Sequence, residues 1–231
     1  MKIGVIVFPG SNCDHDMVYS LQNIIGIDTV RLWHTNTNLE NCDIIAVPGG
    51  FSYGDYLRSG AIAKFSPIME SVVKFANDGG YVFGVCNGFQ ILCEAGLLPG
   101  TLLHNTNQKF ICRNQYIVAE NNNTAMTKYL SKQILNIPIA HGEGRYYASE
   151  ETLQEMVCNN QIVWRYCDKD GHLNEKSNPN GSLMNIAGIC NKNQNVFGMM
   201  PHPERAADIE LHNIDGLEIL NSFVKFVENT K

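Results

Sequence analysis

One short segment, residues 84–90, constrains the fold of this chain more than any other. It reads Gly-Val-Cys-Asn-Gly-Phe-Gln. The apolar residues 80–83 before it predict a buried strand, and residues 89–95 after it predict a helix. Cys86 falls on the sharp turn between the two, where glycines on both sides leave room for the backbones to cross closely. The segment therefore predicts a strand, a tight turn and a helix in direct succession.

This position of Cys86 suits a nucleophile. Its side chain should project from the end of the sheet, toward the free amide groups and the positive dipole end of the following helix. Both favour a thiolate and any oxyanion that forms beside it. A small buried cysteine that merely packs in a tight turn explains the segment equally well when it is taken alone.

Composition sets the broad class. With 231 residues, 44% of them hydrophobic, the chain can bury a full core, and we expect residues 1–231 to form a single domain. The net charge of −6 gives no reason to expect a nucleic-acid or anionic-membrane partner. A strand begins at once, with neither a secretory-signal pattern nor an apolar run long enough to span a bilayer, so we expect a cytoplasmic protein.

The eight cysteines are dilute for a chain of this length, and none forms a Cys-x-x-Cys pair. We expect most to be reduced and buried, with Cys42, Cys93 and Cys190 in the core. Cys13 lies in a predicted loop and has no clear role. The spacings indicate no zinc site, so no bound metal is expected.

Strand and helix patterns alternate in the first half of the chain, which predicts a parallel sheet with helices on both faces. The predicted strands are residues 2–8, 29–33, 43–47 and 81–85, and the predicted helices are residues 16–25 and 66–79. The second half predicts a mixed or antiparallel region, with strands at residues 115–119, 134–140, 161–166, 186–190 and 196–200. A polar stretch, 168–182, predicts an exposed loop, and 214–227 predicts a helix whose apolar side faces the sheet.

A base for Cys86 is suggested by the segment Pro201-His202-Pro203-Glu204, which follows a predicted strand. The prolines restrict the backbone, and alternate residues of an extended segment point to one side, so Glu204 can reach His202. Taken alone, a capping or exposed histidine is the more common outcome. Beside a cysteine on a tight turn, the pair instead predicts a catalytic base and the group that orients it.

An oxyanion hole is suggested by Gly49-Gly50 at the end of predicted strand 43–47. Ligands of such sheets bind beyond the carboxyl ends of the strands, so Gly50 and Cys86 should face one crevice. The amide of Gly50, paired with the amide of Asn87, would bind a developing oxyanion. A plain glycine turn remains the alternative.

The pattern Gly-x-Cys-x-Gly-x-Gln, followed by Pro-His-Pro-Glu, resembles the class I, or triad, glutamine amidotransferases. The resemblance implies an α/β fold of flavodoxin-like topology, a mostly parallel sheet with a smaller mixed or antiparallel region. It also implies hydrolysis of L-glutamine to glutamate and ammonia. Cys86 would attack the side-chain amide, His202 would carry the proton to the departing ammonia, Glu204 would orient His202, and water would then release glutamate from the thioester.

Further motifs at residues 8–14, 48–58, 96–100 and 139–145 resemble one subfamily, the glutaminase subunits of phosphoribosylformylglycinamidine synthase. That enzyme of purine biosynthesis converts formylglycinamide ribonucleotide to its amidine with ATP and ammonia. The resemblance implies two partners, which are a large synthase subunit together with a small bridging subunit. This chain has no phosphate-binding loop, so no cofactor is expected in it, and ATP and magnesium would be used by the large subunit.

By their place in these motifs, Phe51, Gln90 and His141 are candidates for glutamine binding. Gln90 could equally pin a loop to the sheet, and His141 could equally be structural. The loop 52–58 is a candidate docking element for the synthase, with Arg58 as the residue to test.

Three alternatives remain, and each has a feature against it. Cysteine hydrolases of similar fold generally arrange different partners around the nucleophile. A non-catalytic regulatory subunit would not need Cys86, His202 and Glu204 together. An amidotransferase that serves another synthase, such as those for GMP, CTP or anthranilate, is disfavoured by the motifs at 51–58 and 141–145.

Overall fold

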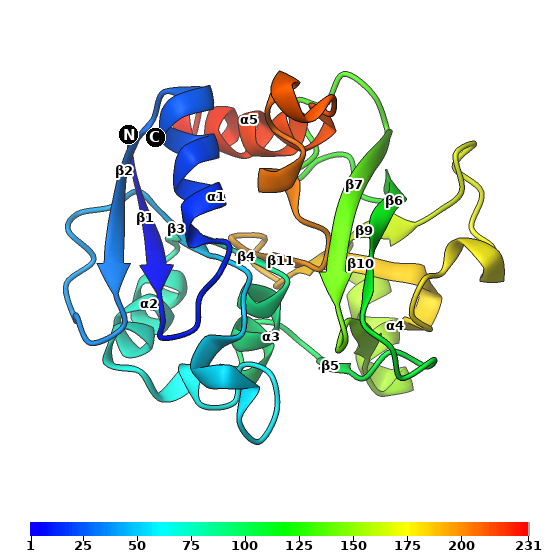
Figure 1. The fold of residues 1–231 in the computed structure, drawn as a ribbon, viewed down its shortest axis with the longest axis horizontal. Coiled ribbons are helices and arrows are strands. Elements are labelled where there is room, and N and C mark those ends of the chain that lie inside the picture. The colour runs from blue at the N-terminus through cyan, green and yellow to red at the C-terminus, as the bar shows by residue number, and fades with distance from the viewer. Residues whose placement is uncertain (231) are drawn as a thin grey trace.

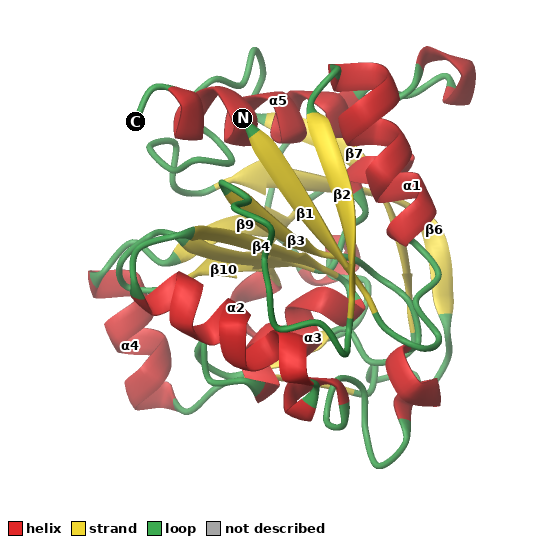
Figure 2. Cartoon of the chain, turned by 90° about the vertical axis from the view of Figure 1, so that its left-hand side faces the viewer, coloured by secondary structure: helices red, strands yellow, loops and turns green. Residues whose placement is uncertain are grey.

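A nine-stranded sheet forms the centre of the computed structural model, which describes residues 1–230, and helices cover both faces of the sheet (Figures 1 and 2). The strand order is β2-β1-β3-β4-β11-β10-β9-β6-β7. The strands are β1 (Lys2–Val7), β2 (Asp28–Trp33), β3 (Ile44–Val47), β4 (Tyr81–Val85), β6 (Ile111–Ala119), β7 (Ile134–His141), β9 (Ile162–Tyr166), β10 (Ile186–Cys190) and β11 (Val196–Met199). Each of the nine overlaps a strand predicted from the sequence, although β6 begins four residues before the predicted strand 115–119.

The half of the sheet that carries the site is parallel. Strands β2, β1, β3, β4 and β11 pair in parallel, so their carboxyl ends meet at one edge. The helices are α1 (Asp14–Tyr19), which continues as a π-helix at Ser20–Ile25, then α2 (Pro67–Asn77), α3 (Asn87–Glu94), α4 (Glu150–Cys158) and α5 (Asp215–Glu228). Figure 2 shows α1 and α5 on one face of the sheet and α2, α3 and α4 on the other.

The other half is antiparallel and continues the same sheet. Strands β10, β9, β6 and β7 follow β11 in antiparallel pairs. A separate two-stranded sheet of β5 (Thr101–Leu103) and β8 (Arg145–Tyr147) was not predicted, and neither was α4. These strands have three residues each, which is too short for an alternating pattern to appear in the sequence.

The prediction that 168–182 is an exposed loop is wrong for part of the segment. Residues 172–176 are exposed, but Ser177, Asn180 and Ser182 are buried. Asn180 donates from Nδ2 to the carbonyl of Gly144 at 2.7 Å, and Ser182 Oγ accepts from the amide of Tyr146 at 2.9 Å. The polar side chains here satisfy buried backbone groups beside β8, which a polar sequence does not reveal.

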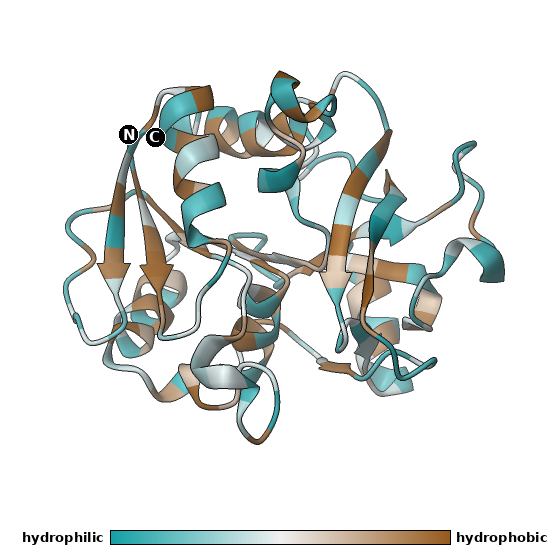
Figure 3. Ribbon diagram, viewed as in Figure 1, coloured by the Kyte–Doolittle hydropathy of each residue, from teal (hydrophilic) through white to brown (hydrophobic). Residues whose placement is uncertain are grey.

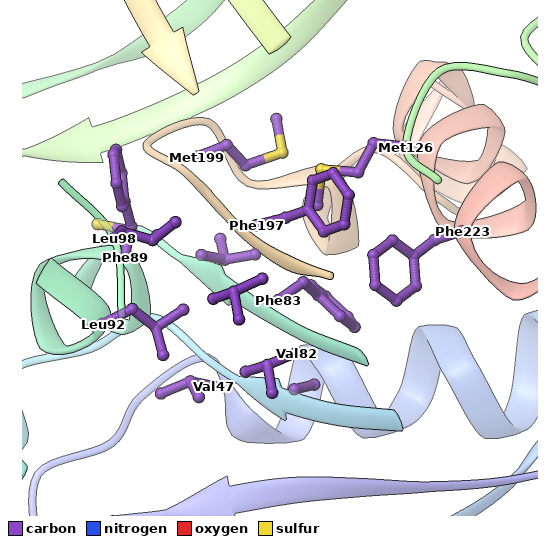
Figure 4. Packing of buried hydrophobic residues seen from close by; sticks show 14 of the residues in the cluster. Val47, Val82, Phe83, Phe89, Leu92, Leu98, Met126, Phe197, Met199 and Phe223 are labelled. Atoms are coloured by element: carbon purple, nitrogen blue, oxygen red, sulfur yellow. The ribbon is translucent and has the colours of Figure 1, made fainter. Parts of the chain in front are cut away.

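Aromatic packing holds together the two strands that lead to the site. Phe223 on α5 lies 5.0 Å from Phe83 on β4 and 5.5 Å from Phe197 on β11, measured between ring centroids (Figure 4). Figure 3 shows the hydrophobic residues along these central strands. Burying each ring stabilises the fold by about 1.5–3 kcal/mol. The chain segments after β4 and β11 therefore start from fixed positions.

All eight cysteines are free thiols, and Cys112 and Cys158 are exposed. Cys42 and Cys190 are buried in the core as predicted, while Cys93 is only partly buried and packs against it. Within residues 1–230, no helix combines the length and the apolar character needed to cross a membrane.

Candidate active site

Cys86 has the strained backbone that the sequence predicts for it. Its φ of 52° and ψ of −107° lie outside the regions that residues with side chains normally adopt, and α3 begins at the next residue. A Cβ atom on Gly88 would lie 1.8 Å from the carbonyl oxygen of Val47, and one on Gly84 would lie 2.6 Å from the backbone of Gly88. The two glycines are therefore required by the close crossing of β3, β4 and α3.

His202 and Glu204 form a buried pair in the segment that follows the carboxyl end of β11. Nδ1 of His202 lies 2.7 Å from Oε1 of Glu204, and both side chains are at most 2% exposed. The predicted contact is confirmed, but the reason given for it is wrong. Residues 203–205 form a 3-10 turn and not an extended segment, and this turn brings the two side chains together.

The contact with Glu204 determines which nitrogen of the His202 ring carries the proton. Because the Glu204 carboxylate accepts the proton on Nδ1, Nε2 is left as the reactive nitrogen, and it has no hydrogen-bond partner among the described residues. Burial opposes a charged ring, but Glu204, with a further contribution from Cys86, raises the pKa of His202 well above its ordinary value. The environment therefore stabilises an imidazolium beside Cys86.

The Gly49–Gly50 peptide is held by the loop at residues 8–14. The carbonyl of Gly49 accepts hydrogen bonds from the amides of Asn12, at 3.4 Å, and Cys13, at 3.1 Å. In a trans peptide the N–H points opposite to the C=O, so the amide of Gly50 points away from this loop. Gly50, which lines the cavity at Cys86, has φ +147°, and a Cβ there would lie 2.6 Å from the amide of Asn12. The geometry is that of a backbone donor aimed at a substrate.

A cavity of about 210 Å³ opens at Cys86. It brings together all three residues predicted to bind glutamine, Phe51, Gln90 and His141, with Gly50 and Cys86. The remaining lining residues were not predicted from the sequence: Asp55, Ser59, His104, Phe110, Ala140, Gly142 and Glu143. The backbone carbonyl of Ala140 lies 3.6 Å from Sγ of Cys86.

The carboxamide of Gln90 is engaged at both ends. It donates to the carbonyl of Glu143 at 2.6 Å and accepts from Nδ2 of Asn87 at 3.0 Å. Oδ1 of Asn87 in turn accepts from the amide of Ser52 at 3.1 Å. These contacts connect the loops that contain Ser52 and Glu143 to α3. They favour the interpretation that Gln90 pins a loop. The side chain of Gln90 also forms part of the cavity wall.

His141 is held as a neutral ring. Asn105 donates from Nδ2 to the carbonyls of Lys109 and His141, so its Oδ1 is the acceptor for Nδ1 of His141, at 3.1 Å. Burial, with a smaller effect of His202, lowers the pKa of His141 to about 4. Its Nε2 therefore carries a free lone pair, and this buried atom has no partner within residues 1–230.

The structure also places a second thiol, Cys13, beside the base. Sγ of Cys13 lies within 4.8 Å of a ring nitrogen of His202 and of a carboxylate oxygen of Glu204. It accepts a hydrogen bond from Nη2 of Arg205 at 3.1 Å. Arg205 is oriented by Asp16, at 3.0 Å from its Nε. Burial raises the pKa of Cys13, which keeps it protonated. Nothing in the spacing of Cys13 and His202 along the chain predicts this proximity.

Comparisons with known proteins agree with this geometry. Residues 1–222 match the family described as the CobB/CobQ-like glutamine amidotransferase domain. The chain is 51% identical to phosphoribosylformylglycinamidine synthase subunit PurQ of Chlorobaculum parvum, covering 100% of this chain and 92% of that protein. It is 54% identical to the PurQ subunit of Koribacter versatilis, with 97% of each chain covered.

Two solved structures are also similar to this chain. The PurLQS structure from Thermotoga maritima matches with a TM-score of 0.86 and 39% identity over 98% of both chains. A glutamine amidotransferase, also from Thermotoga maritima, matches with a TM-score of 0.56 at 12% identity, over 99% of this chain and 92% of that one, which shows a shared fold.

Proposed function

Because the chain belongs to the CobB/CobQ-like glutamine amidotransferase family and resembles PurQ proteins along its whole length, we propose that it is the glutaminase subunit of phosphoribosylformylglycinamidine synthase. The observation that carries its chemistry is the strained turn at Cys86 beside the buried His202–Glu204 pair. It would work in the cytoplasm with a large synthase subunit, joined by a small bridging subunit. The chain itself takes no cofactor, and the large subunit uses ATP and magnesium.

The first half-reaction forms a thioester. The Cys86 thiolate attacks the side-chain carbonyl carbon of glutamine, and the carbonyl electron pair moves to oxygen. The amides of Gly50 and Asn87 bind this oxyanion. As the tetrahedral intermediate collapses, the carbon–nitrogen bond breaks, and His202 donates its Nε2 proton to the leaving nitrogen, which departs as ammonia.

The second half-reaction releases glutamate. His202 takes a proton from water through Nε2, and the hydroxyl oxygen attacks the thioester carbon. The carbon–sulfur bond then breaks, and the thiolate of Cys86 is restored beside a protonated His202. Glu204 keeps the ring in one tautomer through both steps. The ammonia passes to the large subunit, which carries out the ATP-dependent step.

The loop at residues 8–14 is expected to position the oxyanion hole, and one glycine tests this. A Cβ on Gly10 (φ +85°) would lie 2.4 Å from the carbonyl oxygen of Phe51, so Gly10→Ala should displace the Gly50–Phe51 segment. We expect kcat for glutamine hydrolysis to fall about 100-fold, the magnitude of losing one oxyanion donor. KM should rise to a smaller extent, because Phe51 lines the cavity at Cys86.

Gly26→Ala is the matched control for this variant. Gly26 has nearly the same φ, +84°, but a Cβ there would meet nothing within 4 Å. The left-handed backbone should cost each variant about 1–2 kcal/mol of stability, measured by denaturant unfolding, and the contact with Phe51 should add to the loss in Gly10→Ala. If the two variants keep equal kcat, the loop does not position the oxyanion hole.

The loop 52–58, which is exposed at residues 56–58, is our proposed docking element. Arg58 pairs with Glu94 through two contacts of 2.7 Å, and this pair fixes the end of a loop that exposes Tyr56 and Leu57. Arg58→Ala should reduce the stimulation of glutaminase activity by the synthase subunits several-fold, with unstimulated activity unchanged. Lys64→Ala, which removes the other cation near Glu94, is the control. Full stimulation of the Arg58→Ala protein would refute this role.

A further inference from the structure

One oxygen of the Glu204 carboxylate is buried without a hydrogen-bond donor. Oε1 lies 2.7 Å from Nδ1 of His202, but Oε2 has no partner within residues 1–230, although Glu204 is only 3% exposed. The main chain of this residue is fixed, because the hydroxyl of Ser20 donates to the carbonyl of Glu204 at 2.9 Å. A buried charged oxygen that lacks a donor costs free energy, so a polar group beside it affects the stability of the pair.

The thiol of Cys13 lies beside this carboxylate and beside the ring that it holds. Its Sγ is within 4.8 Å of a carboxylate oxygen of Glu204 and of a ring nitrogen of His202. A Cβ on Gly49 would lie 2.8 Å from Cε1 of His202 and 3.1 Å from Sγ of Cys13, so the ring edge and the thiol lie against the same glycine. Cys13 is 2% exposed and, in the part of the chain that the structure describes, is not among the residues that line the cavity at Cys86. Its sulfur is therefore placed to act on the base and not on the substrate.

The backbone of Cys13 is held at both of its polar groups. Its carbonyl accepts from the amide of Met17 at 3.0 Å, and its amide donates to the carbonyl of Gly49 at 3.1 Å. The second of these bonds is one of the two that orient the Gly49–Gly50 peptide. One residue therefore links the predicted oxyanion hole to the predicted base.

Arg205 and Asp16 orient the thiol. Nη2 of Arg205 donates to Sγ of Cys13 at 3.1 Å, and its Nε donates to Asp16 at 3.0 Å. Because the guanidinium is a donor to the sulfur, the S–H bond points away from Arg205 and is available to the carboxylate of Glu204. Burial raises the pKa of Cys13, which keeps this proton on the sulfur.

The ionisation of His202 agrees with this arrangement. Burial lowers the pKa of His202, and Cys13 is one of three groups, together with Glu204 and Cys86, that raise it. The other titratable ring nearby, His141, is neutral, because burial lowers its pKa to about 4. Cys13 therefore acts in the same direction as Glu204 on the charge of the base.

We propose that Cys13 is a positioning residue for the His202–Glu204 pair. Its thiol, oriented by Arg205 and Asp16, fixes the edge of the His202 ring and stabilises the ionised carboxylate of Glu204. The inference rests on the proposed function, since the base it positions is the base of glutamine hydrolysis. Cys13 forms no bond to the substrate and acts through His202 and Glu204 alone.

The test compares two substitutions of Cys13 in the complex with the synthase subunits. Cys13→Ala should lower kcat for glutamine hydrolysis about 10-fold, the size of one lost hydrogen bond, with little change in KM. Cys13→Ser keeps a donor and an acceptor at this position and should restore most of the rate. A titration of His202 by NMR, on the isolated protein, should give a lower pKa in Cys13→Ala than in the wild type, because alanine removes one of the groups that raise it.

Cys42→Ala is the matched control, because Cys42 is also a buried thiol but lies before the amino end of β3, away from the site. It should leave both kcat and the pKa of His202 unchanged. Equal kcat and equal pKa of His202 in Cys13→Ala and Cys42→Ala would overturn the proposal. A Cys13→Ser variant as impaired as Cys13→Ala would also overturn it, because the role of the thiol would then be packing alone.

The failure of this proposal can be told apart from the failure of the proposed function. If the wild-type complex does not hydrolyse glutamine, the proposed function fails. The NMR titration needs no turnover, so it still tests whether Cys13 acts on His202. An unchanged pKa of His202 in Cys13→Ala, with glutamine hydrolysis intact, would refute the positioning role and leave the proposed function standing.

Discussion

Cys86→Ala is expected to lower glutamine hydrolysis by about 10⁴-fold or more, because the covalent intermediate can no longer form. The turn at Cys86 is already strained at φ 52°, and alanine adds no atom there, so the variant should fold normally. Ammonia release in the complex with the synthase subunits measures the effect, and thermal unfolding checks the fold.

Alanine variants of two other cysteines serve as controls for the Cys86→Ala variant. Cys112→Ala alters an exposed thiol and should keep full activity. Cys13→Ala is the sharper comparison, because Cys13 also lies beside His202 but stays protonated through burial. If Cys86→Ala kept activity and Cys13→Ala lost it, the nucleophile would be assigned to the wrong sulfur.

Glu204→Gln is expected to reduce kcat by about 10²–10⁴-fold with little change in KM. An amide can donate a hydrogen bond to Nδ1, which would place the proton of the neutral ring on Nε2, so that Nε2 could not take a proton from water in the second half-reaction. The variant also removes the charge that raises the pKa of His202. The imidazolium should then lose its proton at a lower pH than in the wild type.

The two effects can be measured separately. Steady-state kinetics gives the division between kcat and KM, and a titration of His202 followed by NMR gives the direction of the pKa change. Glu204→Asp keeps the charge at a longer distance and should retain more of both properties. A loss confined to KM, or an unchanged pKa of His202 in Glu204→Gln, would contradict the orienting role.

The sequence predicted the parallel half of the sheet because its signals are local. Short apolar runs bounded by glycine and proline mark β1, β3 and β4, and the strand-turn-helix at Cys86 follows from a short run of consecutive residues, 84–90. Helix α4 was missed although Ser149 provides a cap that accepts from the amide of Thr152. Its apolar residues are few, since only Met156 is buried, so no clear periodic pattern is present.

The residues of the site also fall into two groups, those that local sequence signals predict and those that long-range contacts position. Cys86, His202 and Gly50 each follow the end of a strand, so the topology of a parallel sheet brings them together. Asp55, Asn105 and Glu143 lie in loops whose paths depend on long-range contacts, such as the bond between Gln90 and the carbonyl of Glu143. No spacing in the sequence encodes such a contact. The protonation of His141 likewise depends on Asn105, 36 residues away in the chain.

The most direct test of the central claim is the identity of the residue that glutamine acylates. Treating the protein with the glutamine-mimicking electrophile diazo-oxo-norleucine and mapping the adduct by peptide mass spectrometry should find one modified residue, Cys86, with hydrolysis lost in proportion to labelling. Free glutamine should protect it. An adduct on Cys13, or full labelling of Cys86 with glutaminase activity intact, would contradict the assignment of Cys86 as the nucleophile.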